Sequence, residues 1–165
     1  MTGTRENFAR NLLHTRVDCR RLATLKSSSP WRCILTPQFT SVLLYRLSRA
    51  LFLSPLKPLS IIPTVANNIL FGVEISPRTA IGPGLVLPHP NSIVIGAISI
   101  GEFAIIYQQT TLGSKTFDDG FNSHMRPTIG NHVIIGCGAI ILGNIHIIDN
   151  TLVRANSLTT SSSKL

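Results

Sequence analysis

Residues 129–153 have the sequence IGNHVIIGCGAIILGNIHIIDNTLV, in which an aliphatic residue returns at every sixth position. This series is Ile129, Ile135, Ile141, Ile147 and Val153. A helix does not explain it, because six residues at 100° each turn the next side chain about 120° away from the first, onto a different face. A coil of six-residue units does, since each unit is a short strand plus a corner and points one apolar side chain inward.

The same period continues towards the N-terminus of the chain. Two earlier series share the spacing: Ile75, Ile81, Leu87 and Ile93, then Val94, Ile100, Ile106 and Leu112. The pattern predicts a mainly β protein, with a parallel β-helix of hexapeptide repeats over residues 72–158. A Val/Ile-rich β-sandwich is the alternative, but it has no reason to keep a six-residue step. Residues 113–128 break the period with polar and turn-forming residues, which predicts a loop extruded from the coil.

Residues 1–71 have helical spacing instead and predict an α-helical N-terminal region. One apolar series in it is Phe39, Leu43, Leu47, Ala50 and Leu51. Thr36-Pro37 is a suitable helix start, because proline fits the first turn. A further short helix is expected over residues 59–70, and a frayed tail over 159–165. The final Ser163-Lys164-Leu165 matches a peroxisomal address, and the sequence leaves open whether it acts as one.

The composition narrows the function classes. Apolar residues make up 44% of the 165 residues and charged residues 13%, with a net charge of +8. The basic balance favours anionic partners, but no motif or aromatic-basic run indicates nucleic acid. Three separated cysteines predict reduced thiols and a cytoplasmic location. No apolar run is long enough to span a bilayer, and no His, Cys and carboxylate set has the spacing of a metal site.

Several segments carry a resemblance to a known family. They are GVEISPRTAIGPGLVLPHPNSIVIG at 72–96, TLG at 111–113, RPTIG at 126–130, IIGCGAIILGNI at 134–145 and LLYRLSRALF at 43–52. Together they resemble the serine acetyltransferases and the related O-acetyltransferases of polysaccharide synthesis. The resemblance implies a left-handed β-helix, a homotrimer or a dimer of trimers, and acetyl-CoA as acyl donor to a small hydroxyl acceptor.

Acetyl transfer to a hydroxyl needs a base for the hydroxyl proton, and histidine titrates near working pH. By resemblance, His89 holds the place of the catalytic base, between Pro88 and Pro90. Glu74 lies fifteen residues earlier, where the family has the carboxylate, an aspartate, that orients the base. With eighteen residues to a full turn, these two positions lie on neighbouring rungs, about 4.8 Å apart in height.

The family's second active-site histidine is missing from its expected place. Arg126 stands there, and His124 lies two residues earlier. Either His124 swings in, or Arg126 supplies a fixed positive charge to the substrate or to the oxyanion. Pro88 also replaces the acidic neighbour that serine acetyltransferases carry. The acceptor therefore stays open between L-serine and a sugar hydroxyl, and a catalytically inactive β-helix that serves in assembly or binding is the alternative.

The resemblance also implies a groove for coenzyme A along the coil. The matching cofactor-binding positions are Gly113, Gly136, Cys137, Gly138 and Ala139. Small side chains let a ligand approach the backbone, although coil corners need them equally. Lys115 or Arg154 is expected at the cofactor's phosphates. Outside the inward series lie Ile98, Phe103, Ile105 and Ile140, and we expect a subunit interface to bury them.

Overall fold

The computed structural model describes residues 2–118 and 120–160, excepting the side chains of residues 2–9 and 12. Its helices are α1 (Thr2–Leu25), α2 (Pro30–Cys33), α3 (Pro37–Phe52) and α4 (Ile61–Phe71), with 3-10 turns η1 (Lys57–Ser60) and η2 (Ser123–Met125). Its strands are β1 (Val73–Ile75), β2 (Ala80–Ile81), β3 (Ile93–Ile95), β4 (Ser99–Ile100), β5 (Ile105–Ile106), β6 (Thr111–Gly113), β7 (Thr128–Ile129), β8 (Ile134–Ile135), β9 (Ile140–Leu142), β10 (His146–Ile147), β11 (Leu152–Val153) and β12 (Leu158–Thr160).

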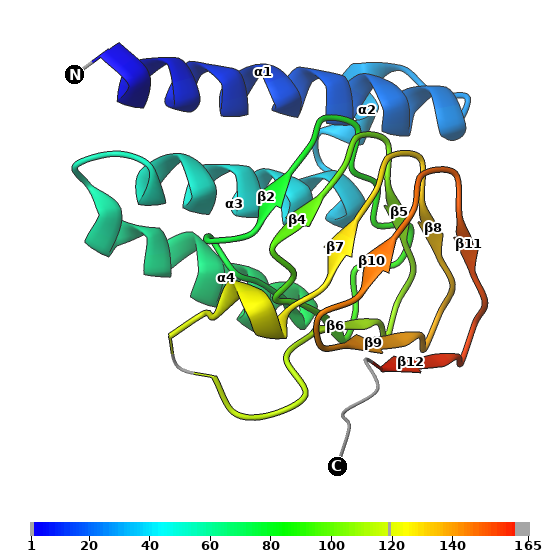
Figure 1. The fold of residues 1–165 in the computed structure, drawn as a ribbon. Coiled ribbons are helices and arrows are strands. Elements are labelled where there is room, and N and C mark those ends of the chain that lie inside the picture. The colour runs from blue at the N-terminus through cyan, green and yellow to red at the C-terminus, as the bar shows by residue number, and fades with distance from the viewer. Residues whose placement is uncertain (1, 119, 161–165) are drawn as a thin grey trace.

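The strands form three parallel sheets that the chain visits in turn. The five-stranded sheet has the order β1-β3-β6-β9-β12, the four-stranded sheet β10-β7-β4-β2 and the three-stranded sheet β11-β8-β5. Figure 1 shows these sheets as the sides of one coil. Three parallel sheets that follow a helical N-terminal region in the chain are what the six-residue period predicts. The helical region ends at Gly72, which adopts the left-handed conformation (φ 62°) that glycine tolerates best.

The coil is filled by the aliphatic series that the sequence displays. Ile81, Ile100 and Ile129 stack on paired strands and are each at most 5% exposed. Val94 is different: it is 40% exposed, and Ile95 takes the inward place beside Leu112. The prediction that an inward series restarts at Val94 is therefore wrong. The reason is a longer corner before β3, which shifts the register.

Two further expectations need correction. Thr159 and Thr160 belong to β12 and pair with β9, so the predicted frayed tail does not begin at 159; residues 161–165, including the terminal Ser-Lys-Leu, lie outside the described residues. Ile105 packs against a buried cluster that includes Cys33 and Phe39 of the helical region. It is therefore partly covered within its own chain, without a subunit interface.

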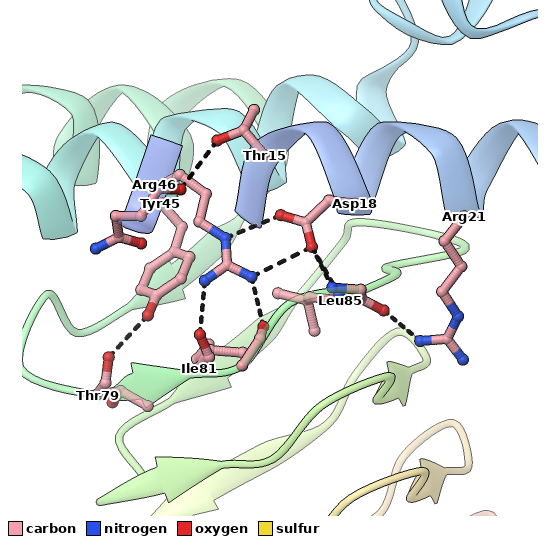
Figure 2. A network of polar contacts seen from close by, with 11 residues as sticks. Thr15, Asp18, Arg21, Tyr45, Arg46, Thr79, Ile81 and Leu85 are labelled. Atoms are coloured by element: carbon pink, nitrogen blue, oxygen red, sulfur yellow. Dashed lines mark hydrogen bonds and ion pairs between the residues drawn. The ribbon is translucent and has the colours of Figure 1, made fainter. Parts of the chain in front are cut away.

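Helices α1 and α3 are fastened to the first turn of the coil by a buried ion pair (Figure 2). The Nε of Arg46 lies 2.9 Å from an Asp18 oxygen, and each side chain is 1% exposed. Arg46 also donates to the carbonyl oxygens of Ile81 and Gly82, at 2.7 and 2.6 Å. The other Asp18 oxygen accepts from the backbone N–H groups of Gly84 and Leu85. The polar groups of this junction are thus well satisfied, as burial demands.

Candidate active site

His89 lies in an extended corner of the coil. The inward residues Ile106 and Leu112 are six positions apart, as are Ile135 and Ile141, whereas Leu87 and Ile95 are eight apart. The bend over residues 88–92 is therefore two residues longer than its equivalents on later turns. His89 is exposed on this bend, between two half-buried prolines. Such an enlarged corner holds a side chain clear of the regular wall.

Helix α3 supports the same bend from behind. The amide of Gln38 donates to the carbonyl oxygen of Pro88 at 3.2 Å, which fixes the residue next to His89. Sequence reasoning missed Gln38, because a glutamine near a helix start carries no motif of its own. It also missed Asp18 and Arg46, although Asp18 is the only acidic residue between Glu6 and Glu74. An isolated acid in a basic helical stretch is a signal for a buried partner.

The positions expected to bind the cofactor lie along the same edge as His89. Backbone hydrogen bonds link the successive corners: Gln109 to Asn91 at 3.1 Å, Gly138 to Gln108 at 3.0 Å and Asn156 to Cys137 at 2.8 Å. His89 and the segment 136–139 are therefore at the one edge between the three-stranded and five-stranded sheets. The structure brings together these two parts of the expected site.

Packing within the chain already explains two of these small residues. A Cβ on Gly136 would lie 2.5 Å from the backbone nitrogen of Ala155, so the stacked turns leave no room for one. Gly138 has a φ of 68° and faces the side chain of Asn156. Gly113 differs, because a Cβ there would meet no atom of the described residues within 4 Å beyond its chain neighbours. Packing within the described part of the chain therefore does not require a glycine here.

Glu74 stands on the outer face of the five-stranded sheet. It pairs with Val94 of β3, the strand that His89 leads into, and both Glu74 and His89 are exposed. No hydrogen bond joins them, and neither side chain has a polar partner among residues 2–118 and 120–160. Glu74 and His89 lie on adjoining segments of the coil. A hydrogen bond between them requires their exposed side chains to turn towards each other.

Arg126 occupies the opposite edge of the five-stranded sheet. Its Nε lies 2.9 Å from an Asp118 carboxylate oxygen, and its Nη1 donates to the carbonyl oxygen of Gly96 at 2.8 Å. Its Nη2 donates to the backbone oxygen of Asp118, and its guanidinium covers the Phe121 ring at 4.2 Å. All three nitrogens are thus engaged in holding the extruded loop against the coil.

The electrostatics of this clamp favour the charged carboxylate. Partial burial by itself would raise the pKa of Asp118, but hydrogen bonds from the Asn122 backbone and from Arg126 outweigh it and lower the pKa below its usual 3.8. His124 is exposed on η2, and its backbone N–H donates to the Asn122 side chain at 3.0 Å. The imidazole of His124 is therefore positioned on the outside of an internally fastened loop.

Apart from Glu74 on the outer face, the expected site residues thus fall into two groups, one at each edge of the five-stranded sheet. His89 and residues 136–139 lie at one edge, and Gly113, His124 and Arg126 lie at the other. A strand of three residues separates the edges by about 10 Å before any corner is counted. Within one chain the two groups do not meet. Among the described residues, no three His, Cys, Asp or Glu side chains are placed to hold a metal ion.

Known proteins resemble the chain in sequence and in fold. No known protein-family profile matches it. A serine acetyltransferase of Helicobacter pylori is 33% identical over 129 residues, which cover 78% of this chain and 74% of the relative. One of Synechococcus elongatus is 33% identical over 123 residues, 74% of this chain but 49% of the relative. The chain therefore spans about half the length of that relative. A solved serine acetyltransferase in complex with CoA has a TM-score of 0.78 over 95% of this chain and 65% of that one, at 23% identity.

Proposed function

The chain belongs to the serine acetyltransferase family, and from this premise we propose that it transfers the acetyl group of acetyl-CoA to a hydroxyl, with L-serine as the first acceptor to test. The observation that carries the proposal is the shared edge: an exposed histidine on an enlarged corner, in line with the small residues 136–139. The proposal includes the left-handed winding of the coil, and three parallel sheets visited in turn are compatible with it. Relatives named as enzymes favour catalysis over an inactive assembly subunit.

In this mechanism His89 acts as the general base. The acceptor oxygen attacks the thioester carbonyl carbon while a ring nitrogen of His89 takes the hydroxyl proton. The tetrahedral intermediate then collapses, the carbon–sulfur bond breaks, and the imidazolium returns the proton to the departing thiolate of CoA. His89 has no competing partner among the described residues, so its ring is free for both proton transfers.

Glu74 is the positioning residue for His89. Its carboxylate would accept a hydrogen bond from the second ring nitrogen, select the reactive tautomer and stabilise the imidazolium. Glu74 is one methylene longer than the family's aspartate. The extra length suits a pair in which both side chains are exposed and the corner carrying His89 is two residues longer than the others.

The groove for acetyl-CoA follows the edge that His89 shares with residues 136–139. Gly113 adds an open position at the far edge of the same sheet, where a ligand approaches the backbone without meeting a side chain. A neighbouring structure that carries CoA supports the choice of donor. Release of free CoA, followed with a thiol reagent, therefore tests the donor before the acceptor is known.

A trimer completes the site. The two groups of site residues lie on opposite edges of one chain, so a neighbouring chain must bring its Gly113–Arg126 side to His89. The outer face between them carries exposed apolar residues, Val94, Ile140 and Leu158, which an interface would cover. A mass near three times 17.9 kDa, or a multiple of it, is expected. Mixing inactive His89→Ala chains with an inactive Arg126→Ala or His124→Ala variant should restore partial turnover, whereas a fully active monomer would overturn the trimer.

The decisive test of the base is His89→Ala. We expect a loss of roughly 10²–10⁴-fold in kcat with unchanged thermal stability, because the side chain is exposed. The matched control is His146→Ala, another exposed histidine on the coil, which should retain turnover. Near-normal turnover of His89→Ala would remove this residue from the mechanism.

Glu74→Gln tests the positioning role. Because the amide keeps the size but loses the charge, kcat should fall more than KM rises. Equal activity of the variant and the wild type from pH 6 to 9 would refute the pairing. A panel of L-serine and sugar acceptors then settles the acceptor, since Pro88 stands where serine acetyltransferases carry an acidic residue.

A further inference from the structure

The net charge of the protein lies entirely in its helical part. Residues 1–71 contain ten Lys and Arg but two Asp and Glu, whereas residues 72–165 contain five of each. The +8 of the whole chain is therefore the +8 of the first 71 residues. From Cys19 to Val73 there is no acidic residue at all, and Asp18 is already paired with Arg46. Such asymmetry indicates an anionic partner on the helical side.

Exposed apolar side chains gather with this charge where α1 ends and α2 follows. We call this region the α1–α2 tip, defined by its exposed residues Leu25, Lys26, Trp31, Arg32, Ile34 and Leu35. Trp31 is 67% exposed and Leu35 is 89% exposed, and the Arg32 guanidinium lies 5.2 Å from the Trp31 ring centroid. A mixture of Trp, Leu and Ile with Lys and Arg is typical of surfaces that insert at the boundary of an anionic bilayer.

An open cavity adjoins the α1–α2 tip. It has a volume of about 550 Å³ between α1, α2 and α3, and its lining includes Pro30, Ile34, Phe39 and Leu43. Arg16 and Arg20 also line it, and both are exposed. Apolar walls with arginines at the rim match the chemistry of an anionic phospholipid, an acyl chain beneath a negative headgroup.

We propose that the α1–α2 tip docks the protein on an anionic membrane surface. The structure identifies no helix among the described residues that is long and apolar enough to cross a bilayer, so the contact is interfacial. Figure 1 shows α1 and α2 on the side of the coil away from β12 and from the extruded loop. The docking does not depend on the acetyl transfer proposed above.

The protein contains its own probe, because Trp31 is the only tryptophan. At low ionic strength, vesicles of phosphatidylglycerol and phosphatidylcholine should shift the Trp31 emission to the blue, and brominated phosphatidylglycerol should quench it. Vesicles of phosphatidylcholine alone should do neither. Raising the salt to about 0.1 M should weaken binding, because the screening length shrinks to about 10 Å.

Variants separate the contribution of the charged side chains to vesicle binding from that of the apolar side chains. Lys26→Gln/Arg32→Gln should lower the vesicle affinity about 25-fold, at about fivefold for each charge near the surface. Leu35→Ser should also weaken binding, measured by the same emission shift. The matched control is Leu152→Ser on β11, which replaces an exposed leucine outside the α1–α2 tip; Leu152 is 67% exposed, as Trp31 is. This variant should bind vesicles as the wild type does.

Four results would overturn the proposal. They are the absence of an emission shift with phosphatidylglycerol, an equal shift with phosphatidylcholine alone, and an equal loss in the Leu152→Ser control. The fourth is a Trp31 emission that depends on protein concentration without vesicles, which would show that a second copy covers the tip. If the protein binds a duplex oligonucleotide but no vesicle, the first of these results is met, and the basic helical region is then a nucleic-acid surface.

Discussion

Two arginine–aspartate pairs in this protein are built from the same parts and serve different ends. Arg46 with Asp18 and Arg126 with Asp118 each combine one ion pair with hydrogen bonds to coil carbonyl oxygens. The first pair is 1% exposed on both sides, whereas the second is 12% and 6% exposed in its side chains. The first joins the helices to the coil, and the second holds one loop.

The position of each pair in the fold decides how much of the structure depends on it. Removing one partner of a buried pair leaves an uncompensated charge without water, so the whole fold bears the cost. The Arg126–Asp118 pair joins a single loop to the coil and no helix depends on it, so we expect the consequence of breaking it to stay local. We therefore expect the helix junction to be fixed under native conditions, and the loop over residues 113–128 to open before the coil does.

The largest expected effect is that of Arg46→Met. The variant keeps most of the side-chain length but strands the Asp18 carboxylate and the carbonyl oxygens of Ile81 and Gly82. We expect a loss of about 3–5 kcal/mol in the free energy of unfolding, measured by urea titration. The matched control is Arg126→Met, which should lose less, because its pair fastens one loop to the coil and not two helices. Equal losses in the two variants would end the distinction between the pairs.

Much of the coil was predictable because its period is a packing requirement. Each inward position must stack on its equivalent in the next turn, which lies eighteen residues later where the corners are regular, as Ile147 does from Ile129. The position of Val94 was not predictable in this way. A corner can lengthen by two residues without any change of composition, and only the strand pairing shows that Ile95 is the inward residue.

The residues of the candidate site also divide into those that the sequence could predict and those that it could not. His89, Glu74 and residues 136–139 were predicted from the resemblance to the serine acetyltransferases, because each lies within a segment that carries it. Asp18, Gln38 and the clamp function of Arg126 did not, since they depend on contacts between distant segments, 66 positions apart for Asp18 and Gly84. Arg126 was predicted to meet substrate, and that remains a prediction, although its three nitrogens have partners in the loop and coil.

The next effect separates these two roles of Arg126. Arg126→Lys keeps the positive charge but loses the planar fork that reaches both Asp118 and Gly96. If the clamp is its role, chymotrypsin should cleave the loop about five to tenfold faster than in the wild type, at the 95% exposed Phe117, and kcat/KM should fall. If the charge alone matters to substrate, the lysine variant should retain kcat/KM, and only Arg126→Met should lose it.

The smallest effect is the response of the clamp to acid, and its sign follows from the pKa of Asp118. Hydrogen bonds from Asn122 and Arg126 hold that pKa below 3.8, so the folded loop favours the carboxylate. The stabilisation is complete above the unfolded value near 3.8 and is lost as the pH falls through the lower folded value. The NMR signal of the Arg126 Nε–H should therefore stay unchanged down to about pH 4 and shift only below it.

Asp118→Asn is the control, because it removes the titrating group and should give a signal that does not respond in this window. A wild-type signal that already shifts between pH 6 and 4 would contradict the clamp, because an unperturbed or raised pKa is then required.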